Sequence, residues 1–281
     1  MQIQRHIRSF VLRAGRMTPA QERALAELWP AYGMELSDGP LDLAAIFGRD
    51  APRCLEIGFG VGEVIGKLAE HHPHIDYLGI EVHRPGVGRL LLHAARMNLR
   101  NLRVICHDAV EVLKDQLPDD SFDEILVFFP DPWHKKRHHK RRLIDSTFVA
   151  SAAAKLRSGG VLRLATDWQA YAEQMLAVCN ADPLLASLSP DGTYVARPEF
   201  RSPTRFERRG ERLGHGVWDL AYTKLTAAAS LRPPLPLPPS LPLPLPLPLP
   251  LPLPLSLPSE KAPANPVDDE LHGEGGENHA G

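Results

Sequence analysis

The stretch Leu55-Glu56-Ile57-Gly58-Phe59-Gly60-Val61-Gly62 places three glycines at alternate positions directly after an apolar run. The apolar run predicts a strand, and the helical spacing of apolar residues from Glu63 to Glu70 predicts a helix behind it. Glycine allows left-handed backbone and a close approach to a ligand. A strand, a glycine loop and a helix in this order are typical of α/β proteins that bind a nucleotide-like cofactor.

The same alternation continues along the chain. The runs that predict strands are Cys54–Ile57, Tyr77–Val82, Leu102–Cys106, Ile125–Phe129 and Val161–Ala165. The segments that predict helices are Glu63–Glu70, Pro85–Asn98, Asp145–Leu156, which Ser158-Gly159-Gly160 ends, and Trp168–Asn180. Repeated strand–helix units predict an α/β fold with a mostly parallel sheet and helices on both faces. Gly192–Ala196 and Gly216–Lys224 are expected to form an antiparallel pair near the C-terminal end of the fold.

The two ends of the chain differ from this body. We expect residues 1–30 to form a basic arm and a short helix, with Thr18 as its N-cap and Pro19 at its first position. Residues 31–224 are expected to form the cofactor-binding domain. Residues 225–281 are expected to be a disordered tail, first rich in leucine and proline and then acidic. We interpret the tail as a spacer, with a docking role as the alternative.

Composition argues against a membrane protein and against a secreted protein. The chain has 281 residues, of which 28 are proline, and 15 of these prolines lie between Pro233 and Pro266. Proline at nearly every second position removes the amide donors that a membrane-spanning helix needs. The N-terminal arm lacks the apolar segment of a secretory signal, and the three cysteines are far apart, which favours reduced thiols. We therefore expect a soluble cytoplasmic protein without a membrane partner.

The residues around the glycine loop indicate which cofactor binds. The dinucleotide fingerprint requires a third glycine where this chain has Glu63, whose carboxylate would repel a pyrophosphate at the helix N-terminus. S-adenosylmethionine carries no phosphate and suits an acidic loop better. Glu81 ends the second strand, at a distance suited to ribose hydroxyls, and Asp108 follows the third, where an adenine amino group could donate. We expect cofactor binding by the following residues: Glu56, Gly58, Gly60, Gly62, Glu81, Asp108 and Asp131.

A second motif follows the fourth predicted strand. Pro130 and Pro132 restrict the backbone around Asp131 and can present its carboxylate at the carboxyl edge of the sheet. Trp133 offers a flat face for stacking a base, or for plain packing. Lys135–Arg142 holds six cations and two histidines in eight residues. Such a cluster beside a cofactor site favours a polyanionic substrate, because cations gain from counterion release on nucleic acid.

Together these residues resemble the tRNA (guanine-N7-)-methyltransferase family. The resemblance runs through Arg8-Ser9-Phe10-Val11, Gly15-Arg16-Met17-Thr18, Glu56–Gly60, Phe129–Arg137, Ala165-Thr166-Asp167 and Thr204–Gly210. The strings F-P-D-P-W-x-K-K-R and T-x-F-E-x-x-G are its most specific parts. The leucine–proline tail has no counterpart in the family pattern.

The resemblance implies a class I methyltransferase fold that moves a methyl group from S-adenosyl-L-methionine to N7 of a guanine in the variable loop of tRNA. It gives the catalytic role to Asp131. It implies substrate binding by Lys135, Asp167, Thr204, Arg205, Phe206 and Glu207. It implies RNA contacts by Arg137, His138, His139, Lys140, Arg141 and Arg142.

Two other classes of function fit parts of the sequence. One is a methyltransferase that acts on another RNA, on a protein or on a small molecule. A protein or small-molecule substrate would make the cations at Arg137, Lys140, Arg141 and Arg142 dispensable. The other is a non-catalytic RNA-binding protein, which would not need carboxylates at successive strand ends. No metal is expected, because the histidine clusters at His71–His74 and at His138 and His139 lack supporting thiols or carboxylates. The sequence leaves the oligomeric state, monomer or dimer, open.

Overall fold

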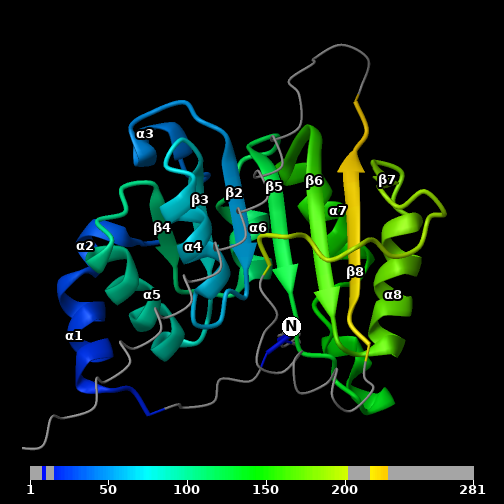
Figure 1. Ribbon diagram of the computed structural model, residues 1–281, viewed down its shortest axis with the longest axis horizontal. Coiled ribbons are helices and arrows are strands. Elements are labelled where there is room, and N and C mark those ends of the chain that lie inside the picture. Colours follow the sequence, from blue (N-terminus) through cyan, green and yellow to red (C-terminus); the bar gives the residue numbers. More distant parts are fainter. Residues whose placement is uncertain (1–7, 11–15, 202–215, 227–281) are drawn as a thin grey trace, which may run out of the picture. The chain divides into compact units, whose positions relative to one another are not determined.

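The computed structural model describes residues 8–10, 16–201 and 216–226 (Figure 1). The predicted tail beyond residue 226 and the segment that contains Thr204–Glu207 lie outside these ranges. Eight strands are described: β1 (Gly33–Met34), β2 (Arg53–Ile57), β3 (Asp76–Ile80), β4 (Leu102–Ile105), β5 (Phe122–Phe128), β6 (Leu156–Thr166), β7 (Leu185–Ser187) and β8 (Trp218–Lys224). The described helices are α1 (Pro19–Glu27), α2 (Trp29–Tyr32), α3 (Leu43–Phe47), α4 (Glu63–His71), α5 (Arg84–Arg96), α6 (Ala109–Asp115), the 3₁₀ helix η1 (Lys136–Arg141), α7 (Ser146–Lys155) and α8 (Gln169–Asn180).

The strands form one sheet in the order β1-β4-β3-β2-β5-β6-β8-β7. All pairs from β1 to β6 are parallel, whereas β8 runs antiparallel to β6 and to β7. The predicted α/β sheet, mostly parallel with an antiparallel strand near the C-terminal end, is confirmed. The strand order reverses between β2 and β5, and open sheets of this type bind ligands beyond the strand ends at such a point.

The prediction for the antiparallel pair was half wrong. β8 is a strand, but Gly192–Ala196 is not, and this segment pairs with β8 through a single isolated bridge between Val195 and Asp219. The reason is a turn that precedes Val195, because the Asp191 carboxylate accepts hydrogen bonds from the Ser189 hydroxyl and from the Thr193 amide and hydroxyl. This turn and the left-handed Gly192 (φ +73°) prevent the extended backbone that a strand requires.

The end of α7 also differs from the prediction. The helix ends at Lys155, and Ser158-Gly159-Gly160 lie within β6 rather than in a loop behind the helix. The register between β5 and β6 shifts at this place, between Phe122 and Glu124, and Gly159 is left-handed (φ +77°). The glycines therefore form an irregularity inside a strand, which is a common use of glycine in sheets.

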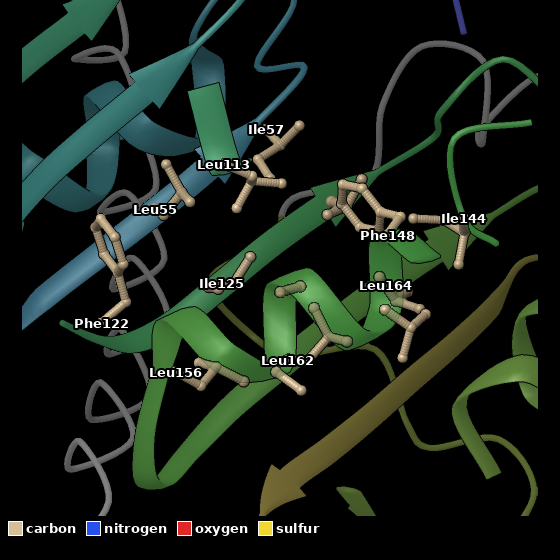
Figure 2. Close-up of a cluster of buried hydrophobic side chains, with 14 of the residues drawn as sticks. Leu55, Ile57, Leu113, Phe122, Ile125, Ile144, Phe148, Leu156, Leu162 and Leu164 are labelled. Atoms are coloured by element: carbon tan, nitrogen blue, oxygen red, sulfur yellow. The ribbon is translucent and has the colours of Figure 1, made fainter. Parts of the chain in front are cut away.

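Helices cover both faces of the sheet. On one face α1, α2, α4 and α5 pack on apolar side chains of β2 to β5. On the other face α3, α6, α7 and α8 pack on the alternate side chains of the same strands. Figure 2 shows part of this second core, where Phe148 of α7 and Ile144 lie beside Ile125, Leu162 and Leu164 of the sheet.

The predicted N-terminal helix is present as α1. Thr18 caps it, because its hydroxyl accepts from the Gln21 amide while the Gln21 side chain accepts from the Thr18 amide. The Gln21 side chain also donates to the carbonyl of Pro85 (3.0 Å), which fixes α1 to the first turn of α5. Among the described helices, none is long and apolar enough to cross a membrane.

Candidate active site

The glycine loop between β2 and α4 is left-handed at all three glycines. The φ angles of Gly58, Gly60 and Gly62 are +72°, +58° and +76°. A Cβ atom at Gly58 or Gly60 would meet no protein atom within 4 Å, so these two positions border open space. The loop is tightly packed on its other side, because a Cβ atom at Gly86 of α5 would overlap the carbonyl oxygen of Gly60. The loop thus forms a cradle of exposed backbone beyond the end of β2.

Glu56 lies in β2 just before this cradle and is only 4% exposed. Its Oε2 atom is buried without a hydrogen-bond partner among the described residues. Burial raises the pKa of Glu56 from 4.5 to about 8; the nearby Glu81 carboxylate raises it further, while a hydrogen bond from the Ile65 amide lowers it. A buried unpaired carboxylate oxygen is costly, so this position favours a ligand that brings a donor or a positive charge.

Glu81 follows β3 and binds the glycine loop directly. Its Oε2 accepts from the Gly60 amide (2.7 Å), and its Oε1 accepts from the amides of Val82 and His83 (2.7 and 2.9 Å). A carboxylate has about four acceptor sites, so ribose hydroxyls can still donate to it. Glu81 therefore also fixes the shape of the loop, which the sequence did not indicate.

Asp108 follows β4 and caps α6. Its Oδ1 accepts from the Val110 amide (3.0 Å), whereas its Oδ2 is buried without a partner among the described residues. The open cradle and the unpaired oxygens of Glu56 and Asp108 suit a ligand that carries two amino groups. S-adenosylmethionine has such groups, on its methionine and on its adenine, and no phosphate. The side chains present thus fit this cofactor.

The turn after β5 is strained on both sides of Asp131. Phe129 and Trp133 adopt left-handed backbone, with φ of +54° and +45°. Such a conformation costs a non-glycine residue on the order of 1 kcal/mol or more and is concentrated at functional sites. Asp131 between them is exposed. The strained turn therefore presents this carboxylate at the carboxyl edge of the sheet.

A cavity of about 660 Å³ joins the glycine loop to this turn. Its lining includes Gly58, Glu81, Asp131, Lys135, His138 and, from the N-terminal arm, Phe10. Glu56, Asp108 and Asp167 are not among its lining residues. The structure therefore brings the predicted cofactor loop and the predicted catalytic carboxylate to one cavity. The sequence did not predict that Phe10 lies there, because nothing in it links residues so far apart.

Trp133 is half-buried; it packs against its neighbours and also lines the cavity. Its indole N–H donates to the carbonyl of Ser9 (2.9 Å), and the Arg141 guanidinium lies 4.3 Å from the ring centroid. The His138 ring meets Trp133 edge to face, with centroids 5.9 Å apart. Arg141 also donates from Nε to the carbonyl of Arg8 (3.2 Å). Trp133 thus connects the N-terminal arm to the basic cluster, and of its two predicted roles the packing role is the one observed.

The cations of the basic cluster, Lys135–Arg142, differ in exposure, and Arg141 is half-buried. Lys135, Lys136, Arg137 and Lys140 are exposed. Arg142 is only 4% exposed, and its guanidinium donates to the carbonyls of Pro132 and Ala170 and to the Gln174 side chain. Protein acceptors hold the Arg142 guanidinium, and its predicted RNA contact stays a prediction.

The two histidines of the cluster are half-buried. Partial burial and the neighbouring cations, Arg137 and Arg141 first among them, lower the pKa of His138. This shift favours the neutral form of the His138 ring. A ring nitrogen of His139 lies 3.2 Å from Nη2 of Arg142, which couples it to the buried arginine.

Comparison with known proteins agrees with this geometry. A family model described as "Putative methyltransferase" matches residues 50–220. The tRNA (guanine-N(7)-)-methyltransferase of Ectopseudomonas mendocina is 55% identical over 220 residues, which cover 78% of this chain and 92% of that protein. The enzyme of the same name from Serratia proteamaculans is 54% identical over the same shares of the two chains. This chain belongs to the tRNA (guanine-N(7)-)-methyltransferase family.

The resemblance to a methyltransferase family is thus confirmed. Asp167 and Thr204–Glu207 are the remaining predicted substrate-binding residues. Asp167 is exposed directly after β6, next to Trp168, whose ring meets that of His134 with centroids 4.1 Å apart. Thr204, Arg205, Phe206 and Glu207 lie outside the described residues. No group of three or more metal-binding side chains occurs within the described ranges.

Proposed function

We propose that this chain transfers the methyl group of S-adenosylmethionine to N7 of a guanine in the variable loop of tRNA, which gives 7-methylguanosine. The observation that carries the proposal is the cavity that Gly58 and Asp131 line together, in a member of this family. Bound S-adenosylmethionine supplies a methyl group on a positively charged sulfur. The residues of the chain bind, orient and shield the reacting groups.

Two carboxylates at the strand ends supply acceptors for the cofactor. Glu56 would pair with the methionine ammonium group, because its unpaired oxygen lies just before the cradle. Asp108 would accept a hydrogen bond from the adenine amino group with its own unpaired oxygen. The left-handed backbone at Gly58 and Gly60 leaves room for the cofactor beside the loop. These contacts fix the cofactor and supply the in-line approach that methyl transfer needs.

The guanine end needs no strong base. N7 of guanine has a free lone pair, so no proton must leave before it attacks. The purine gains positive charge during the reaction, and a nearby carboxylate compensates it. We assign this role to Asp131, which would also accept a hydrogen bond from the guanine edge, and we keep Asp167 as a second acceptor. The four exposed cations Lys135, Lys136, Arg137 and Lys140 would bind phosphates on either side of the target guanine.

A pair of transcripts tests this proposal. An unmodified tRNA with a guanine at the variable-loop position and a matched transcript with adenine there are incubated with the purified enzyme and S-adenosylmethionine. Methylation of the first transcript alone supports the assignment of substrate and position. Equal methylation of both would place the target elsewhere, and methylation of neither would favour another RNA, a protein or a small molecule as acceptor.

A further inference from the structure

Arg201 is the largest fully buried side chain of the described residues, at 1% exposure. Its guanidinium binds the carboxylate of Asp219 in β8 through two bonds, Nε to Oδ1 at 3.2 Å and Nη2 to Oδ2 at 2.7 Å. Asp219 is itself only 5% exposed. A two-bond arginine–carboxylate pair has a fixed geometry, and burial of both charges makes it costly to disturb.

This pair lies against the start of the strained turn. The Arg201 guanidinium is 5.6 Å from the centroid of the Phe128 ring and 5.1 Å from that of Phe129. Phe128 ends β5, and both rings line the cavity. Phe129 has the left-handed backbone that begins the turn around Asp131. Strained backbone persists only where its surroundings determine it, and a desolvated cation over an aromatic ring stabilises the position of that ring.

The same pair lies beside two strands that lead to the candidate guanine site. Asp219 pairs in the β6–β8 ladder with Ala165, which stands two residues before Asp167. The Phe129 amide donates to the carbonyl of Ala165 (2.8 Å), which joins the ends of β5 and β6. The strand ends that lead to Asp131 and to Asp167 therefore both lie against one buried ion pair.

We propose that the Arg201–Asp219 pair is a positioning element for methyl transfer, which sets where Asp131 stands relative to the guanine. This inference rests on the proposed function. The pair touches neither the glycine cradle nor Glu56 in the described contacts. Its disturbance is therefore expected to change the chemical step and to leave cofactor affinity unchanged.

The test compares Arg201→Lys with a matched control. Lysine keeps the charge but cannot form the two-bond fork or lie flat over Phe129. The control is Arg157→Lys, which changes a half-buried arginine, 14% exposed, that is paired with the buried carboxylate of Asp123 (2.9 Å). Neither residue lines the cavity. For each variant kcat, KM for tRNA, the dissociation constant for S-adenosylmethionine and Tm are measured.

A misplacement of about 1 Å in an active site can lower the rate about 100-fold, so we expect Arg201→Lys to lower kcat between about 10- and 100-fold. Its cofactor dissociation constant stays within about threefold of the wild type, and Arg157→Lys keeps kcat within the same margin. The proposal is overturned if Arg201→Lys retains kcat, or if kcat and cofactor affinity fall in parallel as in a general loss of structure.

A second variant and the product of the wild-type enzyme complete the test. Should Arg201→Lys not fold, Asp219→Asn is measured in its place, with the same expected loss of kcat and the same outcome against the proposal. Failure of the inference differs from failure of the proposed function. In the first case the wild-type enzyme makes 7-methylguanosine and the variants do so equally fast, whereas in the second the wild-type enzyme makes none.

Discussion

Binding of S-adenosylmethionine is expected to release a proton from Glu56. The carboxyl group is buried with one oxygen unpaired, and its pKa is raised from 4.5 to about 8, first by burial and then by the Glu81 carboxylate. At pH 6.5 a group with this pKa is about 97% protonated in the free enzyme. The methionine amino group, with an ordinary pKa of about 7.7–8.0, is already protonated at that pH. Pairing the two groups as ions therefore releases nearly one proton.

Calorimetry measures this proton directly and needs no turnover. The binding enthalpy at pH 6.5 is determined in buffers of different ionisation enthalpy, and its slope against that enthalpy gives the protons exchanged. We expect a release of about 0.9 protons per cofactor bound by the wild type, and a value near zero for Glu56→Gln. Glu81→Gln removes the neighbouring negative charge and tests whether it contributes to the raised pKa. A wild-type slope near zero, with the cofactor bound, would refute the account of Glu56.

The same group makes stability depend on pH. A folded-state pKa above the unfolded value means that the folded state binds the proton more tightly, so this stabilisation is complete below pH 4.5 and disappears as pH rises through about 8. Each pKa unit corresponds to about 1.4 kcal/mol, so the difference amounts to about 5 kcal/mol as an order of magnitude. Glu56→Gln is expected to lack this decline. Denaturant unfolding of both proteins from pH 5 to 8.5 measures the growing difference between them.

Four other substitutions test three separate parts of the site. Asp131→Ala is expected to lower kcat at least about 100-fold while tRNA still binds. A single-turnover rate within a few fold of the wild type would contradict the role of Asp131. Lys140→Ala is expected to reduce the salt slope of tRNA affinity by about one and to leave Tm unchanged. Arg142→Ala is expected to lower Tm, because Arg142 is buried. Equal effects of the two substitutions on the salt slope would contradict their division into exposed and buried cations. Gly60→Ala is expected to weaken cofactor binding at least about tenfold in calorimetry. The φ angle of Gly60 is +58°, and the new methyl group would enter the cradle. Unchanged affinity would show that the cofactor lies elsewhere.

The regular part of the fold could be predicted because its signals are local. The apolar runs at Cys54–Ile57 and Ile125–Phe129 and the cap at Thr18 depend on neighbouring residues only, and the structure has strands and a capped helix there. Gly192–Ala196 contains the apolar residues of a strand, yet the Asp191 turn that bends the chain before it depends on side-chain hydrogen bonds. Residue types alone do not show whether the strand or the turn forms.

In the candidate site, too, local features could be predicted and tertiary contacts could not. The glycine loop and Asp131 follow from strand ends, which a sequence pattern locates. The burial of Arg142 could not be predicted, because a run of cations does not show which member turns inward to Gln174. The pairing of Arg201 with Asp219 joins residues that flank a stretch of no regular pattern, and it becomes visible only when β8 lies beside β6.

The most direct test of the central claim is a methyl-transfer assay with analysis of the product nucleosides. The purified enzyme is incubated with unmodified tRNA and methyl-labelled S-adenosylmethionine, and the RNA is digested completely to nucleosides. The account predicts that the label is found in 7-methylguanosine. Label in a different nucleoside, or no label in RNA while the cofactor still binds, would contradict it.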